Sequence, residues 1–160
     1  MTADEARTRI FNRAIKLLTV KARSEAELRE RLLQGKNVDQ AVVEAVIARL
    51  KEYGYLNDER FAFSYASLRV KQRPLGRRRL ERDLKLKKVA KGVAEEALQL
   101  VYAETPEEQL IDAAIEKRVR LRGRPKTREE AKKLFDHLLR QGFEFELVSD
   151  KVRALFDPYC

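Results

Sequence analysis

Apolar side chains recur at i, i+4 spacing along most of this chain, which is the spacing of one face of an α-helix. Three such pairs follow one another at intervals of 52 and 54 residues: Leu28 with Leu32, Leu80 with Leu84, and Leu134 with Leu138. A second apolar series follows each pair after a short turn: Val38, Val42 and Leu50, then Val89, Val93 and Val101, then Phe143, Leu147 and Leu155. The intervals of the second series are 51 and 54 residues, so the pattern indicates an internal repeat.

We therefore predict an all-α fold of three tandem three-helix repeats, with boundaries at 1–55, 56–104 and 105–160. Each repeat is about 50 residues long and buries too little surface to be stable alone, so contacts between neighbours matter. Stacked repeats of this kind form an elongated, curved array. A single compact helical bundle fits the composition equally well and stays open as the alternative.

Capping signals divide the chain into about nine short helices. Two predicted helix starts pair a capping side chain with a carboxylate three residues later, namely Ser24 with Glu27 and Thr127 with Glu130. At two further starts a single side chain is the predicted cap: Asp39, and Asn57 or Asp58. A fifth start is the step Thr105-Pro106, with the threonine as cap and the proline in the first turn. Gly35, Gly54 and Gly142 follow apolar stretches, where a helix end favours a left-handed residue.

Of the side chains, 44% are hydrophobic and 38% charged, which suffices for a folded core. The first residues contain acids beside bases and no apolar run follows that could span a bilayer, so we expect a cytoplasmic protein. No sustained heptad pattern indicates a coiled-coil dimer, and we expect a monomer.

The formal charge of +9 is concentrated in residues 69–91, which contain eleven Lys or Arg and two carboxylates, while the rest of the chain is neutral. The candidate contacts there are Arg69, Lys71, Arg73, Arg77, Arg78, Arg79, Arg82, Lys85, Lys87 and Lys88. Arg78, Arg82 and Lys85 are spaced i, i+4 and i+7, which places them along the face opposite Leu80 and Leu84. Phosphate groups match such a face, because arginine binds their oxygens and counterions are released. A solvated face without a ligand is the alternative.

A second basic cluster contains no acid between residues 117 and 128. Its candidate contacts are Lys117, Arg118, Arg120, Arg122 and Arg124. Glu116 is positioned to pair with Arg120 at i, i+4, and further acids flank the cluster. A secondary contact site and an ordinary neutral surface both remain open.

Aromatic residues gather between positions 53 and 65, namely Tyr53, Tyr55, Phe61, Phe63 and Tyr65. Aromatic rings beside a basic segment can stack nucleobases. However, Tyr55 and Leu56 before the cap and Phe61 after it fit a hydrophobic staple. We therefore favour packing in the core and between repeats over base stacking.

Catalytic and metal-binding patterns are missing from the sequence. The single histidine, His137, and the single cysteine, the terminal Cys160, cannot build a Cys/His zinc site in one chain. There is no glycine-rich phosphate loop and no nucleophile elbow. We therefore expect a protein that is not an enzyme and that binds no metal and no cofactor.

The segment Tyr55-Leu56-Asn57-Asp58-Glu59-Arg60-Phe61, followed by Arg69, Gly76 and the basic helix, resembles the signature of the bacterial RecX family. The resemblance extends over essentially the whole chain. It departs from the family pattern at two positions, where Lys88 stands in place of a common glycine and Asn57 in place of a common aspartate.

The resemblance implies a non-catalytic regulator that binds the RecA recombinase. Its expected target is the RecA filament on single-stranded DNA, where it restrains ATPase, strand exchange and SOS coprotease activity, with weak, sequence-independent binding to DNA. A free-standing helical DNA-binding module, which would prefer particular duplex sequences, is the first alternative. A protein-interaction scaffold insensitive to DNA is the second, and its binding would survive high salt.

Overall fold

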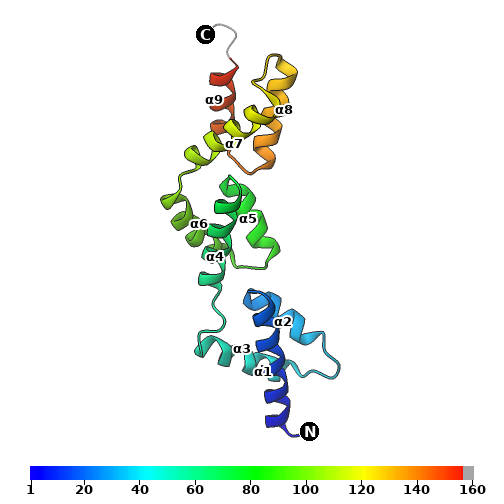
Figure 1. The fold of residues 1–160 in the computed structure, drawn as a ribbon. Coiled ribbons are helices and arrows are strands. Elements are labelled where there is room, and N and C mark those ends of the chain that lie inside the picture. The colour runs from blue at the N-terminus through cyan, green and yellow to red at the C-terminus, as the bar shows by residue number, and fades with distance from the viewer. Residues whose placement is uncertain (157–160) are drawn as a thin grey trace. The chain divides into compact units, whose positions relative to one another are not determined.

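The computed structural model describes residues 1–156, and this part of the chain contains nine α-helices and no β-strand (Figure 1). The helices are α1 (Ala3–Val20), α2 (Glu25–Leu33), α3 (Gln40–Glu52), α4 (Asp58–Gln72), α5 (Arg77–Leu86), α6 (Lys91–Glu104), α7 (Glu107–Arg122), α8 (Arg128–Arg140) and α9 (Phe145–Leu155). The predicted all-helical class of three-helix repeats is confirmed. Cys160 lies outside the described residues.

The first compact unit contains residues 1–62 and 84–94. In its core, α1, α2 and α3 pack against one another, and Leu28, Leu32, Val43 and Leu50 are fully buried. The guanidinium of Arg13 on α1 donates hydrogen bonds to two carbonyl groups at the end of α2, so it satisfies acceptors that the helix leaves open.

Two hydrogen bonds connect the start of α2 to the middle repeat within this unit. The Ser24 hydroxyl donates to the Lys87 carbonyl at 2.5 Å, and the Asp58 carboxylate accepts from the Glu25 backbone N–H at 2.8 Å. Ser24 is completely buried and also caps α2. The middle repeat therefore contributes segments to the first unit.

The second compact unit contains residues 63–83 and, within the described part of the chain, residues 95–156. The Tyr102 hydroxyl donates to the Leu75 carbonyl at 2.9 Å, and the Glu107 carboxylate accepts from the Arg77 backbone N–H at 2.6 Å. Phe143, only 1% exposed, is the largest fully buried side chain among the described residues. The start of α5 is thus held by a segment of the third repeat, and the predicted boundaries at 55/56 and 104/105 stay predictions.

Four of the five predicted helix starts are confirmed. Ser24, Asp39, Asn57 and Thr127 each accept a hydrogen bond from a backbone N–H in the following first turn. The prediction for Thr105 was wrong, because Pro106 occupies the cap position of α7 without a side-chain hydrogen bond. The Glu107 carboxylate in the first turn of α7 accepts from the distant Arg77 backbone N–H.

Left-handed residues end several helices. Gly54 (φ 74°) and Gly142 (φ 95°) adopt this conformation as predicted, but Gly35 does not, and Asn37 (φ 53°) takes it two residues later. Lys88 (φ 62°) ends α5 in the same way, with the Lys88 N–H bound to the Lys85 carbonyl and the Val89 N–H bound to the Leu84 carbonyl. This is a Schellman motif, which normally carries glycine at the left-handed position.

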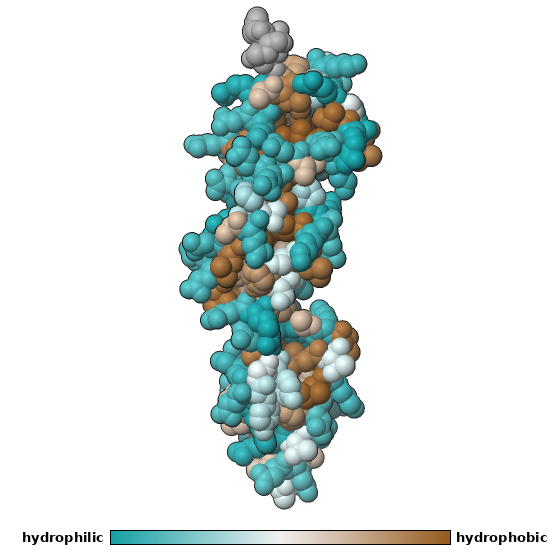
Figure 2. Space-filling view, turned by 60° about the vertical axis from the view of Figure 1, so that its left-hand side comes forward, coloured by the Kyte–Doolittle hydropathy of each residue, from teal (hydrophilic) through white to brown (hydrophobic). Residues whose placement is uncertain are grey.

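Hydrophilic side chains cover most of the face shown in Figure 2, and apolar residues appear on it in separate patches. Exposed large apolar side chains include Leu68, Leu86, Leu100 and Leu121. Within residues 1–156, none of the helices combines the length and the apolar character that a membrane crossing requires.

Candidate functional site

The basic face of α5 consists of Arg78, Arg82 and Lys85, and all three side chains are exposed. Leu80 and Leu84 on the opposite side of the helix are fully buried, as predicted. Among the described residues, none of the three cations forms an ion pair. Like charges at i, i+4 disfavour a helix by about 0.2–0.5 kcal/mol per pair, so this face is well suited to an anionic ligand.

Neighbouring arginines are partly neutralised inside the protein. Arg77 pairs with Glu81 at 3.4 Å, while Arg79 and Arg69 both approach the Asp83 carboxylate, at 3.6 and 3.7 Å. Asp83 is only 15% exposed. These arginines therefore have less charge to offer a ligand than the basic face of α5 has, and their predicted role in binding remains a prediction.

The ends of the basic segment differ in their surroundings. Lys71 and Arg73 are exposed near the end of α4. Lys88 pairs with Glu30 of the first repeat, and the backbone carbonyl of Lys87 accepts from Ser24. Residues 87 and 88 thus help to hold the first unit together, independently of any ligand.

The second basic cluster lies along α7 and the loop that follows. Lys117, Arg120, Arg122 and Arg124 are exposed, whereas Arg118 is half-buried. The expected pair between Glu116 and Arg120 is not formed within the described residues. Burial first, and then the charges of Arg122 and Arg140, lower the pKa of the Arg118 guanidinium. The cluster is therefore less neutralised than its sequence indicates.

The structure adds residues of α8 to this cluster. Arg118, Arg122 and Lys133 line a depression of about 390 Å³ between α7 and α8, with Glu130 as the one acid in its lining. His137 lies one helical turn beyond Lys133. Its pKa is lowered mainly by burial and then by four positive charges, those of Arg118, Arg140, Arg73 and Arg122.

Sequence reasoning missed Lys133, His137 and Arg140 as members of the basic cluster. A signal was present, because these residues are spaced i, i+4 and i+7 on α8, the same spacing as on the basic face of α5. Asp136 and the acids at the start of α8 conceal this spacing when only net charge is counted.

Several residues of the segment 55–61, which resembles the RecX signature, form hydrogen bonds within the fold. Asn57 caps α4 through the Arg60 backbone N–H, and the Arg60 guanidinium donates to the Gly54 carbonyl at 2.6 Å. Asp58 accepts from the Glu25 backbone, and burial raises the pKa of its carboxyl. Leu56 is buried, as predicted, while Glu59 is exposed.

The packing interpretation was wrong for two of the five clustered aromatics. Tyr53 and Tyr55 are 52% and 56% exposed, and their rings contact each other edge to face. Phe61 is half-buried, and Leu56 before the cap is buried. The staple contact between these two residues stays a prediction.

The described residues contain no group of three or more His, Cys, Asp or Glu side chains arranged to hold a metal ion. The depression between α7 and α8 is open, and so are those beside α1 and α3; cations, polar groups and aromatic rings predominate in their linings. The charged side chains in these linings are mainly cations, which suits binding to an anion.

Two models of known protein families match this chain. Residues 11–50 match the model of the first three-helix domain of RecX, and residues 57–98 match that of the second. This chain belongs to the RecX family. The two matches together cover more than half of its residues and most of α1 to α6.

Relatives named regulatory protein RecX are similar over most of the chain. The one from Bacillus velezensis is 34% identical over 142 residues, covering 87% of this chain and 52% of that protein. The one from Prosthecochloris aestuarii is 31% identical over 153 residues, covering 96% and 97%. The chain therefore spans about half the length of the Bacillus relative and nearly all of the Prosthecochloris one.

Solved RecX structures share the fold. The crystal structure of RecX from Lactobacillus salivarius superposes with a TM-score of 0.83 over 95% of this chain and 97% of that one, at 20% sequence identity. A second RecX crystal structure gives a TM-score of 0.79 at 18% identity. At these identities the likeness shows the fold alone.

Proposed function

We propose that this RecX-family protein is a non-enzymatic regulator of the RecA recombinase. It binds in the groove of the filament that RecA forms on single-stranded DNA. In this proposal it restrains the filament's ATPase, strand exchange and SOS coprotease activity. It requires no cofactor or metal. Family membership supports the regulatory role, and the basic face of α5 supports contact with a nucleoprotein.

The basic face of α5 is the observation that carries the proposal. Three exposed cations follow one another at helical spacing without an internal counter-charge among the described residues. Each can bind a phosphate of the filament DNA or a carboxylate of a recombinase protomer. Because phosphate contacts fix register without reading bases, we expect this face to bind DNA weakly and independently of sequence.

The test is the RecA ATPase on single-stranded DNA, measured while the protein is titrated in. We expect the wild type to lower the ATPase rate and the triple variant Arg78→Glu, Arg82→Glu, Lys85→Glu to lose this effect. A control variant with the same change in charge, Lys21→Glu, Lys36→Glu, Arg153→Glu, alters exposed cations outside both basic clusters and should retain it. Circular dichroism should show that both variants remain folded, because surface changes usually alter stability by about 0.5 kcal/mol or less.

Two results would contradict the proposal at different levels. A wild-type protein without effect on the ATPase would remove the regulatory function itself. A folded triple variant that inhibits as strongly as the wild type would show that another surface contacts the filament. Sequence-dependent binding to naked duplex DNA would favour the DNA-binding module instead.

A further inference from the structure

The first unit exposes two tyrosines beside a third aromatic ring. The ring centroids of Tyr53 and Tyr55 are 5.9 Å apart, and Tyr53 meets Phe11 edge to face at 6.2 Å. Tyr53 and Tyr55 are each more than half exposed. A soluble protein gains little stability from aromatic rings that remain in water, so a cluster of this kind marks a binding surface.

Two open depressions meet at Tyr53 and Phe11. One, of about 360 Å³, lies between α1 and α3 and includes Arg7 and Arg49 in its lining. The other, of about 790 Å³, extends past Tyr55 and Arg60. Neither depression is lined by a carboxylate.

Arg49 connects the rings to positive charge. Its guanidinium carbon lies 5.8 Å from the centre of the Phe11 ring and 5.5 Å from that of Tyr53, within the range of a cation–π contact. Arg49 Nε also donates to the Tyr53 hydroxyl at 3.0 Å. The arginine therefore fixes the orientation of the ring and places a cation at its edge.

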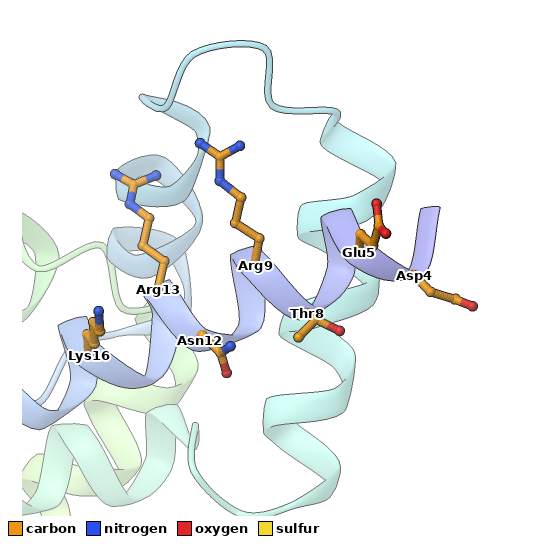
Figure 3. A pocket seen from close by; sticks show the side chains of 7 residues that line it. All are labelled: Asp4, Glu5, Thr8, Arg9, Asn12, Arg13 and Lys16. Atoms are coloured by element: carbon orange, nitrogen blue, oxygen red, sulfur yellow. The ribbon is translucent and has the colours of Figure 1, made fainter. Parts of the chain in front are cut away.

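A third depression continues this surface along α1 (Figure 3). It shares Thr8 with the first depression and Asn12 with the second. Figure 3 shows Arg9 and Arg13 pointing to one side of α1, and Thr8 and Asn12 pointing to the other.

The cations on this side of α1 are not equally available. The Arg13 guanidinium is bound to carbonyl groups of α2, whereas Arg9 and Lys16 are exposed and form no ion pair within the described residues. Of the two acids in the lining, Glu5 is held in the capping box of α1 and Asp4 lies at the helix start. A row of positive charge thus runs beside the aromatic depressions, separated from them by Thr8 and Asn12.

We propose that this α1–α3 surface, formed by Phe11, Tyr53, Tyr55 and Arg49 together with Arg9 and Lys16, binds unpaired nucleotides of a single strand. The bases stack on the tyrosine rings, and the phosphates lie along the cations. A single strand has flat bases that match the exposed rings and regularly spaced phosphates that match the cations. A protein segment need not carry both of these groups. The site is separate from the basic face of α5 and needs no recombinase.

The test measures binding of the full chain to a short thymidine strand and to an abasic strand of the same length and charge, without recombinase. We expect the wild type to bind the thymidine strand more tightly. The double variant Tyr53→Leu, Tyr55→Leu should lose at least about fivefold in affinity for the thymidine strand, since stacking on an aromatic ring contributes about 1–3 kcal/mol per base. Its affinity for the abasic strand should stay unchanged.

Phe145→Leu is the matched control, because Phe145 is 58% exposed, packs edge to face on Phe135 and belongs to the second unit. It should bind both strands as the wild type does. Tyrosine fluorescence gives a second readout, since the chain has five tyrosines and no tryptophan, and stacking on Tyr53 and Tyr55 should quench it.

Equal affinity of the wild type for the two strands would overturn the stacking site, whatever the variants do. An equal loss on both strands in the double variant would also overturn it, because such a loss reports charge or folding rather than bases. Since recombinase is absent from these measurements, their failure leaves the regulatory function to be decided by the ATPase.

Discussion

Gly76 and Gly142 bring two backbone segments of the second unit into direct contact. The Gly76 N–H donates to the Gln141 carbonyl at 2.9 Å, and the Arg78 N–H donates to the Gly142 carbonyl at 3.1 Å. A Cβ added to Gly76 would overlap the backbone of Gly142 and Phe143, and one added to Gly142 would overlap Arg79. Close packing between the α4–α5 turn and the α8–α9 turn therefore explains why a glycine stands at position 76, one of the positions that resemble the RecX signature.

Replacing Gly76 by alanine should destabilise the protein by about 1–3 kcal/mol or more, because the overlapping atoms are backbone and cannot move aside. For a chain of this length the thermal midpoint should fall by about 2–4 °C per kcal/mol. Gly92→Ala is the control, since a Cβ there meets nothing within 4 Å, and alanine in α6 should stabilise slightly. A Gly76→Ala protein as stable as the wild type would contradict this account.

Lys88 adopts the left-handed conformation at φ 62° that glycine adopts more easily. Lys88→Gly should therefore be more stable than Lys88→Ala by about 1 kcal/mol in chemical unfolding. Both substitutions remove the ion pair with Glu30, so the difference between them isolates the backbone effect. If the alanine variant is as stable as the glycine variant, the left-handed conformation costs the native chain nothing.

Phe143 and Phe61 should differ in their contribution to stability. Phe143 is 1% exposed, and Phe143→Ala should cost about 3–5 kcal/mol. Phe61 is half-buried, so Phe61→Ala should cost clearly less. Urea unfolding of the two variants in parallel measures the order, and the reverse order would contradict this difference in burial.

Replacing Arg78, Arg82 and Lys85 by alanine should weaken the salt dependence of DNA binding. Each phosphate contact contributes about one unit to the slope of log affinity against log salt, so the slope should decrease by up to about three units. Fluorescence anisotropy over a range of salt concentrations measures it. An unchanged slope would assign these three residues to a solvated face.

His137 should make stability depend on pH. Its pKa is lowered in the folded protein, mainly by burial and then by the nearby arginines, so the unfolded chain binds a proton more readily. The stabilising contribution is complete above the unfolded pKa of about 6.5 and is lost as the pH falls from there through the folded pKa. His137→Gln should lose less stability than the wild type between about pH 7 and pH 5 in thermal unfolding.

A bound polyanion should counteract the arginines around His137 and raise its pKa. Because the chain has one histidine, its NMR resonance can be followed without ambiguity. A pKa that stays the same when single-stranded DNA is added would show that the cluster around His137 binds no phosphate.

Local sequence determined where four of the nine helices in residues 1–156 begin. Ser24, Asp39, Asn57 and Thr127 were predicted as caps and are caps, because a capping side chain and its backbone partner lie only two or three residues apart. The apolar pairs of the three repeats were also predicted, and Leu28, Leu80 and Leu138 are fully buried. Both signals depend on neighbours within one or two helical turns.

Tertiary structure decided what depends on distant partners. The Glu107 carboxylate accepts a hydrogen bond from a backbone N–H thirty residues away, and Arg79 shares Asp83 with Arg69. The exposure of Tyr53 and the four arginines around His137 were equally hidden from the sequence. Whether a ring is covered and whether a charge is compensated are set by segments that meet only in the folded chain, and no local pattern encodes that meeting.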